Sequence, residues 1–311
     1  MTISEQIAPA DLRGLQYLHD NQLPYGEFRT YASPSKDMKA TFLDSSIFAT
    51  TFVLYSIARI DHPCVTVMAN KAISFLKREM CGCGLFQYYT SKNARSIDFD
   101  LDDTACASFV LQGSHPLITR GYNVGYFIEN RNEDGLFYTW VGRATPANNV
   151  DSVVNANVAL YLGDRDETKS ASRFLVDTIK SGDESNSYHY YLDNITLYYA
   201  VSRAYAHGAL SLSGARDAVI ENILQSSRDD GSFGNELATA WAVCSLANFE
   251  YDSVTRIGSA LRYLERRQRA DGSWRRAPMF HGSGVYYGSE ELTTALCLEA
   301  LTHRGVRKYR A

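Results

Sequence analysis

The sequence has little excess of charge of either sign. Its 31 lysines and arginines stand against 35 aspartates and glutamates, a formal net charge of −4 over 311 residues. A chain without an overall basic field exerts no general attraction on nucleic acid or anionic lipid. We therefore expect no nucleic-acid partner, and a small molecule rather than a polymer as the substrate.

Long hydrophobic runs are also missing, although 45% of the residues are hydrophobic. No run reaches the roughly 20 residues that span a bilayer. Residues 1–11 lack the apolar core of a secretory leader, and the six cysteines lack the spacing of a secreted disulfide framework. These absences predict a cytoplasmic protein with no membrane span.

No linker rich in proline, glycine and serine divides the chain, but a short pattern recurs along it. A glycine is followed two residues later by an aromatic residue at Gly26/Phe28, Gly84/Phe86, Gly135/Phe137, Gly231/Phe233 and Gly272/Trp274. The spacing leaves room for one degenerate copy near residues 187–191. Self-similarity of this kind is typical of folds built from stacked supersecondary units.

Each turn is flanked by two kinds of helical sequence. Amphipathic stretches precede the turns, most clearly at residues 65–80 and 253–269. Apolar stretches follow them, each opened by an acidic residue suited to an N-cap or first turn: Asp44, Asp102, Asp151, Asp193, Glu236 or Glu291. The first and last repeats look like the middle ones, so a closed ring is favoured over an open stack. We expect an all-α fold, an α/α toroid of six inner and six outer helices, as one domain over residues 1–311.

The second inner helix begins with an unusual number of carboxylates: Asp98, Asp100, Asp102 and Asp103. An N-cap role for Asp102, by analogy with Asp151, requires no further chemistry. It leaves the additional carboxylates unexplained. Like charges held together raise at least one pKa, and a protonated carboxyl that faces an apolar cavity is a general acid.

The segment Asp100-Leu101-Asp102-Asp103-Thr104-Ala105 resembles the protonation motif of class II terpene cyclases, which include the squalene–hopene cyclases. Residues 268–274, Gln-Arg-Ala-Asp-Gly-Ser-Trp, match a repeat of the same superfamily, and residues 22–28 form a weaker copy. The resemblance implies that Asp102 protonates a terminal alkene with support from Asp100 and Asp103. It also implies aromatic faces that stabilise the carbocation, and no cofactor or metal.

Most enzymes of this family have two or three helical domains, whereas a single toroid fits this chain. The single-domain type acts on a prenylated hydroxybenzoate. The resemblance therefore implies a prenylated aromatic substrate and a polycyclic product. A free diphosphate such as geranylgeranyl diphosphate is the alternative, with Arg143, Arg203 or Arg275 as candidates to bind phosphate. The oligomeric state is left open.

Six further residues are candidates for the wall of the substrate cavity. They are Asn155, Asn157, Tyr198, Trp241, Tyr286 and Tyr287. The two amides lie in an otherwise apolar helix, where they either pair between helices or orient the Asp102 proton. The aromatic residues either pack in the core or face the cavity.

The sequence leaves four other functions open. A zinc-dependent protein prenyltransferase would need a histidine beside Asp103 and Cys106, and a lanthionine-type cyclase would need further ligands beside Cys81 and Cys83. A class I terpene synthase would need an acid where Cys106 stands. The last is a toroid without catalytic activity that binds an apolar ligand or a protein.

Overall fold

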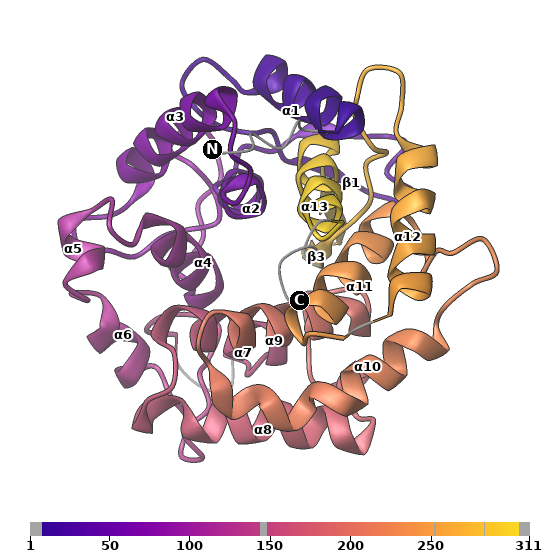
Figure 1. Ribbon diagram of the computed structural model, residues 1–311. Helices are drawn as coiled ribbons and strands as arrows, with labels where there is room; N and C mark the ends of the chain where they lie inside the picture. The colour runs from indigo at the N-terminus through magenta and orange to yellow at the C-terminus, as the bar shows by residue number, and fades with distance from the viewer. Residues whose placement is uncertain (1–7, 144–147, 252, 283, 305–311) are drawn as a thin grey trace, which may run out of the picture.

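The computed structural model describes residues 8–143, 148–251, 253–282 and 284–304. Figure 1 shows two concentric rings of helices. The inner ring contains α2 (Phe48–Ile57), α4 (Leu101–Leu111), α7 (Ser152–Leu162), α9 (Asn194–Ala206), α11 (Glu236–Asn248) and α13 (Glu290–Thr302). The outer ring contains α1 (Pro9–Asn21), α3 (Pro63–Glu79), α5 (Pro116–Thr119), α6 (Val124–Glu129), α8 (Lys169–Ser181), α10 (Arg216–Gln225) and α12 (Val254–Arg267). The predicted all-α toroid is confirmed.

The ring closes on itself. Each inner helix contacts the next, and α13 contacts α2. The first outer helix packs against α13, and the Arg304 guanidinium lies 2.8 Å from the Asp11 carboxylate. Gln268 Nε2 donates to the Ala10 carbonyl at 2.8 Å, which joins the last repeat to the first.

The two rings differ in burial, as their sequences predict. Helix α11 is buried on every face from Glu236 to Leu246, whereas α8 buries mainly one stripe that includes Ala171, Leu175 and Ile179. A stripe at this spacing is the inward face of an amphipathic helix.

The third outer position is divided between two short helices, α5 and α6. Pro116 opens α5, and Gly121 follows it with φ +68°. That left-handed conformation ends the first helix, and α6 begins three residues later. The residues described also form three short 3₁₀ helices: η1 (Asp166–Thr168), η2 (Glu184–Asn186) and η3 (Leu210–Ala215).

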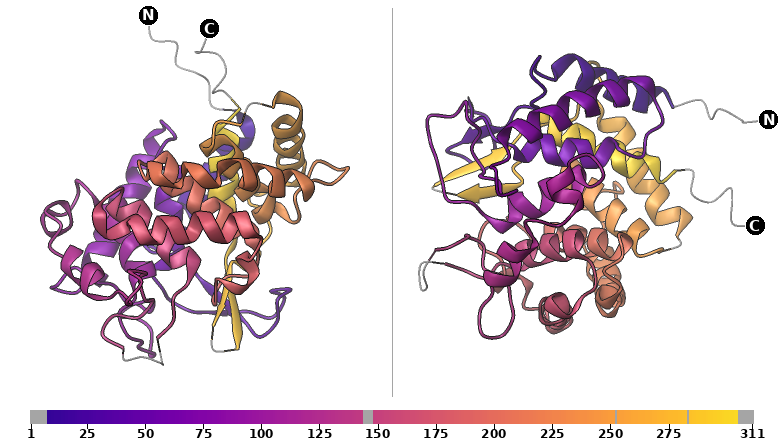
Figure 2. Two further views of the ribbon diagram at one scale, coloured as in Figure 1. Left: turned by 90° about the horizontal axis from the view of Figure 1, so that it is seen from below. Right: turned by 90° about the vertical axis from the view of Figure 1, so that its left-hand side faces the viewer.

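A small antiparallel sheet covers one end of the barrel and was not expected. Its strands are β1 (Tyr31–Ser33), β2 (Phe42–Leu43), β3 (Phe280–Gly282) and β4 (Val285–Gly288), in the order β2-β1-β4-β3. Ala32 pairs with Tyr287, so the sheet joins the first repeat to the last. Figure 2 shows the β3–β4 hairpin at the end of the barrel where α13 begins.

The turn glycines are required by close backbone contacts. Gly26 and Gly272 have φ values of +109° and +89°, and a Cβ at either position would lie 2.2 Å from a carbonyl oxygen of the neighbouring outer helix. Gln22 and Gln268 donate to the carbonyls of these same glycines, at 3.1 and 2.9 Å. The repeat therefore encodes the contact between successive outer helices.

The turn aromatics are fixed by side chains of the inner helices. The backbone N–H of the aromatic residue donates to a side-chain oxygen in the first turns of the following helix. The pairs are Phe28 with Thr50, Phe86 with Thr104, Phe137 with Asn155, Phe233 with Thr239 and Trp274 with Thr294, at 2.8–3.1 Å. Each pair buries a polar donor with its partner, as a core requires.

Candidate active site

Asp100, not Asp102, is the N-cap of α4. Its side chain accepts from the Asp103 backbone N–H at 2.7 Å. Asp151 and Asp193 cap α7 and α9 in the same way. The residue equivalent to Asp151 is therefore Asp100, two positions before the Asp102 that the sequence analogy suggested. The carboxyl of Asp102 is therefore free of a capping role and available for other contacts.

Asp44 does not cap its helix either. The N-cap of α2 is Ile47, and the Asp44 carboxylate pairs with the Arg95 guanidinium. The acidic residue is displaced because a bridge between Ser46 and Tyr89 lies between it and α2.

Two donors hold the Asp102 carboxyl. Asn157 Nδ2 on α7 donates to Oδ1 at 2.6 Å, and the Tyr191 hydroxyl, just before α9, donates to Oδ2 at 2.5 Å. A carboxyl has about four lone-pair positions, so a proton can still reside on it. Both donors stabilise the carboxylate that remains after the proton leaves. The arrangement fits a carboxylic acid that gives its proton away.

Asp102 keeps some accessible surface, whereas Leu101 and Asp103 on either side are buried. Burial in the protein raises the pKa of Asp102. The hydrogen bonds from Tyr191 and Asn157 and the charge of Arg203 oppose that rise. Desolvation therefore favours loading of the proton, and the hydrogen bonds strengthen the acid that carries it.

The other carboxylates separate into two groups. Asp100 and Asp103 are 4% and 6% exposed. Burial and the Asp102 charge raise the pKa of Asp100 to about 7, and burial with both neighbouring charges raises the pKa of Asp103 well above its usual value. Asp98 instead is exposed and pairs with the Arg143 guanidinium at 2.5 Å. The predicted cluster therefore has three members.

An aromatic cluster extends from the acid toward the sheet. The Tyr191 ring lies 6.4 Å from Phe280, which stacks on Tyr287 at 4.8 Å and lies 4.5 Å from Phe48. Tyr88 contacts Phe280 and Tyr287 edge-on, at 5.6 and 5.4 Å. The π face of such a ring stabilises a positive charge that lies over it. Tyr287 thus lies in this cluster, and its role as a cavity aromatic stays a prediction.

A second layer lies deeper in the barrel. Trp241 stacks on Tyr199 at 6.2 Å, and the guanidinium carbon of Arg203 lies 5.2 Å from the Tyr199 ring centre. The indole nitrogen of Trp241 is buried and has no hydrogen-bond partner among the described residues. Trp241 therefore lies in the barrel interior, separated from Asp102 by Asn157 and Arg203.

Three of the other candidates point elsewhere. Asn155 is bonded to the Phe137 backbone through both ends of its amide, at 2.9 and 3.0 Å. The Tyr198 hydroxyl donates to Glu184 at 2.8 Å, toward the outer ring. Tyr286 pairs across the sheet with Ser33, and its side chain leaves the strand on the face opposite to Tyr287. None of the three contacts Asp102 in the described structure.

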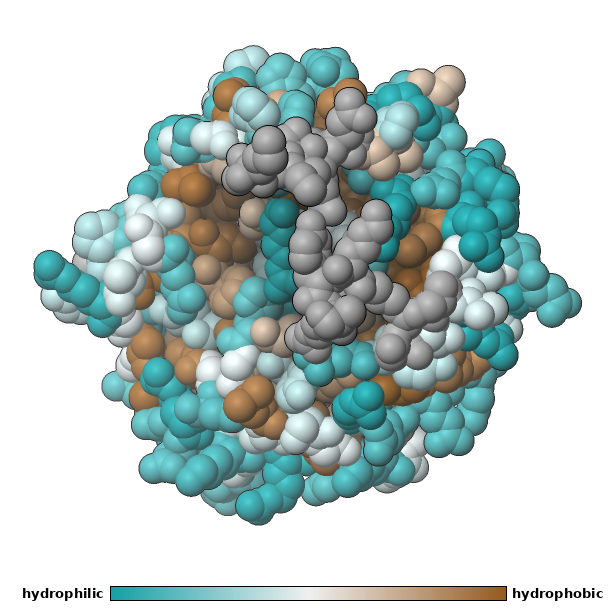
Figure 3. All heavy atoms as spheres, viewed as in Figure 1, coloured by the Kyte–Doolittle hydropathy of each residue, from teal (hydrophilic) through white to brown (hydrophobic). Residues whose placement is uncertain are grey.

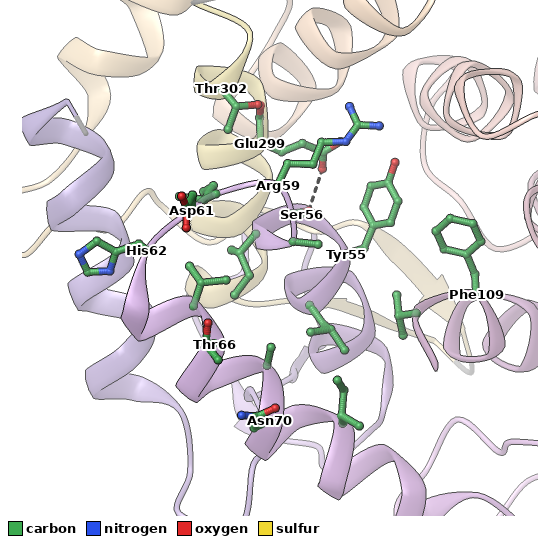
Figure 4. Close-up of a pocket in the computed structure, with 18 of the residues that line it drawn as sticks. Tyr55, Ser56, Arg59, Asp61, His62, Thr66, Asn70, Phe109, Glu299 and Thr302 are labelled. Atoms are coloured by element: carbon green, nitrogen blue, oxygen red, sulfur yellow. Dashed lines mark hydrogen bonds between the residues drawn. The ribbon is translucent and has the colours of Figure 1, made fainter. Parts of the chain in front are cut away.

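A cavity of about 650 Å³ lies at the opposite end of the inner helices. Figure 4 shows Tyr55, Phe109 and Glu299 in its wall, and Figure 3 shows apolar side chains around a hollow on this face. Phe109 is two helical turns from Asp102 along α4, about 10 Å. Tyr55 in its wall also contacts Arg203, which bonds to Asn157 beside the acid.

The zinc-dependent prenyltransferase and the lanthionine-type cyclase both need a set of metal ligands, and the described residues offer none. No group of three or more histidine, cysteine, aspartate or glutamate side chains there is placed to hold a metal ion. The Cys106 Sγ lies 3.7 Å from Arg203 Nη2, and the Cys81 Sγ lies 2.6 Å from the Cys83 Sγ. As a separate finding, no helix in the part described is long and apolar enough to cross a membrane.

No protein-family model matches the sequence, and no curated protein matches it. Solved structures do match. The type II terpene cyclase MstE from Scytonema superposes with a TM-score of 0.72 over 94% of this chain and 97% of its own, at 16% identity. The complex of an MstE variant with the substrate geranylgeranyl dihydroxybenzoate gives a TM-score of 0.71 over 94% of this chain and 95% of its own, also at 16% identity.

A protein from Actinoplanes matches with a TM-score of 0.73 over 94% of this chain and 98% of its own, at 18% identity. An α-amylase from Clostridium perfringens matches with 0.60 over 97% and 100%, at 8% identity. The toroid thus carries unrelated chemistries, and function must be argued from the site. In fold, the chain is similar to a type II terpene cyclase over nearly its whole length.

Proposed function

We propose that the protein is a class II terpene cyclase that converts a linear prenylated aromatic compound into a polycyclic product, with Asp102 as the general acid. The observation that carries the proposal is the Asp102 carboxyl itself. It is freed from capping by Asp100, held by Asn157 and Tyr191, and followed by an aromatic cluster.

The reaction starts when the Asp102 proton adds to the CH carbon of the terminal dimethyl alkene. The alkene electron pair forms the new C–H bond and leaves a tertiary cation. Each following alkene attacks the cation and closes a ring, and the last cation loses a proton to a base or to water. Atoms balance, so substrate and product are isomers, and Asp102 takes up a proton from solvent before the next turnover.

The substrate class is supported by the likeness to MstE. That enzyme has been solved with geranylgeranyl dihydroxybenzoate as its substrate and with merosterolic acid A as its product. Two of the three arginines suggested for phosphate are otherwise engaged: Arg143 pairs with Asp98, and Arg203 is buried beside Asn157. A substrate with an aromatic head requires neither of them.

The test is incubation of the purified protein with a panel of isoprenoids that contains geranylgeranyl dihydroxybenzoate, shorter prenylated benzoates and geranylgeranyl diphosphate. We expect a cyclic isomer of a prenylated arene, formed equally with and without EDTA. Faster turnover of the diphosphate, abolished by EDTA, would assign the protein to the diphosphate-cyclising class instead.

A further inference from the structure

Arg203 is a buried cation with an unusual set of partners. It is 2% exposed, and it takes part in none of the ion pairs found within the described residues. Its Nε has no hydrogen-bond partner there, and its Nη2 donates to Asn157 Oδ1 at 2.5 Å. A buried charge without a directly paired carboxylate is costly, so a sequence that keeps one has a use for it.

Aromatic rings offset part of this cost. The guanidinium carbon lies 4.8 Å from the Phe52 ring centre, 4.9 Å from Tyr55 and 5.2 Å from Tyr199. Three π faces around one guanidinium hold the charge in the barrel centre. They also fix its direction, so that Nη2 faces helix α7.

Asn157 lies between Arg203 and the acid. Its Oδ1 accepts from Arg203, and its Nδ2 donates to Asp102 Oδ1 at 2.6 Å. A guanidinium has donors only, so it forces the amide oxygen toward itself and the NH₂ group toward Asp102. A flipped amide would present its oxygen to the Asp102 proton and compete with the alkene for it.

We propose that Arg203 is a positioning residue of the acid: it sets the orientation of the Asn157 amide and stabilises, by its charge, the Asp102 carboxylate left after proton transfer. The proposal deepens the cyclase function proposed above and rests on it. The same charge lowers the pKa of Asp102 against the larger effect of burial. Arg203 thereby makes Asp102 a stronger acid toward an alkene, which is a very weak base.

The ionisable groups around Asp102 come from three inner-helix segments. They are Asp100, Asp103 and Cys106 on α4 or its cap, Asp151 at the start of α7, and Tyr191 and Arg203 on or before α9. Among them Arg203 alone is a cation. Its removal should therefore raise the pKa of Asp102, while the other neighbours keep their effects.

The first test is Arg203→Met, which removes the charge and the donors but keeps a long apolar stem. Activity requires protonated Asp102, so it is present below the Asp102 pKa and lost as pH rises through it. We expect kcat to fall about ten- to a hundredfold, KM to change little, and the alkaline limb of the pH profile to move to higher pH. A merely structural residue would lower kcat without moving the limb.

Two variants make the test specific. Arg203→Lys keeps the charge but lacks the planar fork, so the limb should stay near its position while kcat falls. Arg267→Met is the matched control: Arg267 also lies over a ring, Tyr263, at 5.9 Å, but it ends outer helix α12, is partly exposed and pairs with Glu236. It should leave both the limb and kcat unchanged.

A double-mutant cycle then tests the connection through Asn157. Asn157→Leu alone should move the limb in the same direction, and Arg203→Met combined with Asn157→Leu should cost less than the sum of the two. Additive effects in folded proteins would overturn the proposal, as would an unmoved limb in Arg203→Met. If Arg203→Met does not fold, two other results decide. The proposal requires that the alkaline limb of Asn157→Leu moves to higher pH and that kcat falls in Arg203→Lys; failure of either would overturn it.

A measurement without turnover separates this inference from the cyclase function. The ¹³C signal of the Asp102 carboxyl, assigned by its loss in Asp102→Asn, is titrated in the wild type and in Arg203→Met. A higher Asp102 pKa in the variant supports the electrostatic role whether or not any isoprenoid is cyclised. An unchanged Asp102 pKa would overturn it, even in an active cyclase.

Discussion

Asn157 and Asp102 lie on adjacent inner helices, with 2.6 Å between Asn157 Nδ2 and Asp102 Oδ1. Asn155 lies two residues earlier in the same helix, and its amide is bonded instead to the Phe137 backbone. Two identical side chains therefore serve two different purposes, and they give a matched pair for mutation.

The pair separates rate from stability. Asn155→Leu leaves the Phe137 N–H and C=O without partners, so we expect the free energy of unfolding to fall by about 1–3 kcal/mol. Cyclisation at a temperature where the variant is folded should be nearly normal. Asn157→Leu leaves Arg203 Nη2 and Asp102 Oδ1 without this partner, so it should lower the free energy of unfolding as well, but it alone of the two should lose at least about tenfold in kcat. Denaturant titrations and steady-state rates measure both.

Asp102→Asn should fold and lose cyclisation. Asn cannot supply the proton, and loss of a positioned acid costs about a hundredfold or more in rate. Asp100 still caps α4, so the melting temperature should hardly fall. Asp98→Asn is the control, because that carboxylate is exposed and paired with Arg143. A folded Asp102→Asn protein with wild-type activity would remove the acid from the mechanism.

Asp100 provides a test of the cap. Asp100→Ala should lower the free energy of unfolding by about 1 kcal/mol because the Asp103 N–H loses its acceptor, whereas Asp100→Asn keeps one. Both variants also change a neighbour of Asp102, so their cyclisation rates should fall. Equal stability of the two variants would argue against the capping role.

The dependence of stability on pH follows from raised pKa values. Burial raises the pKa of Asp100 to about 7 and that of Asp151 to about 6, from 3.8 when unfolded. The folded state then binds protons that the unfolded state has released. The stabilisation is fully present below about pH 4 and is lost as pH rises to about 7. Asp100→Asn should flatten this slope, which denaturation at pH 5 and 7.5 will show.

Phe280 is the central ring of the aromatic cluster, in contact with Tyr191, Phe48 and Tyr287. Phe280→Leu should lower kcat and increase products with fewer rings, because a less stabilised cation loses its proton earlier. Tyr122→Leu, at an exposed position on the outer surface, serves as the control. An unchanged product ratio in Phe280→Leu would place the cation elsewhere.

The toroid was predictable because its signals are local. The turn glycines, the amphipathic outer helices and the apolar inner helices each leave a pattern in sequence. The β1–β4 pairing was not predictable, since it joins residues near 32 and 287 through strands of three and four residues. Short strands carry too few alternating positions to be read from sequence.

The site was predictable in part. The motif predicts Asp102 as the acid, and this stays a prediction. The N-cap role considered for Asp102 was wrong because Asp100 and Asp102 are both acidic and only backbone geometry distinguishes them. Tyr191 was missed because its turn lacks the glycine of the other repeats. Arg203 was named only as a candidate to bind phosphate, because its contact with Asn157 depends on the packing of α7 against α9.

The most direct measurement is product formation from geranylgeranyl dihydroxybenzoate in D₂O. In the proposed mechanism the Asp102 carboxyl exchanges with solvent between turnovers, so protonation of the terminal alkene should place one deuterium on the ring CH₂ beside the gem-dimethyl carbon. Mass spectrometry and NMR of the product, after return to H₂O, detect it. One deuterium at that carbon is the predicted result. A cyclic product without deuterium would contradict protonation as the first step.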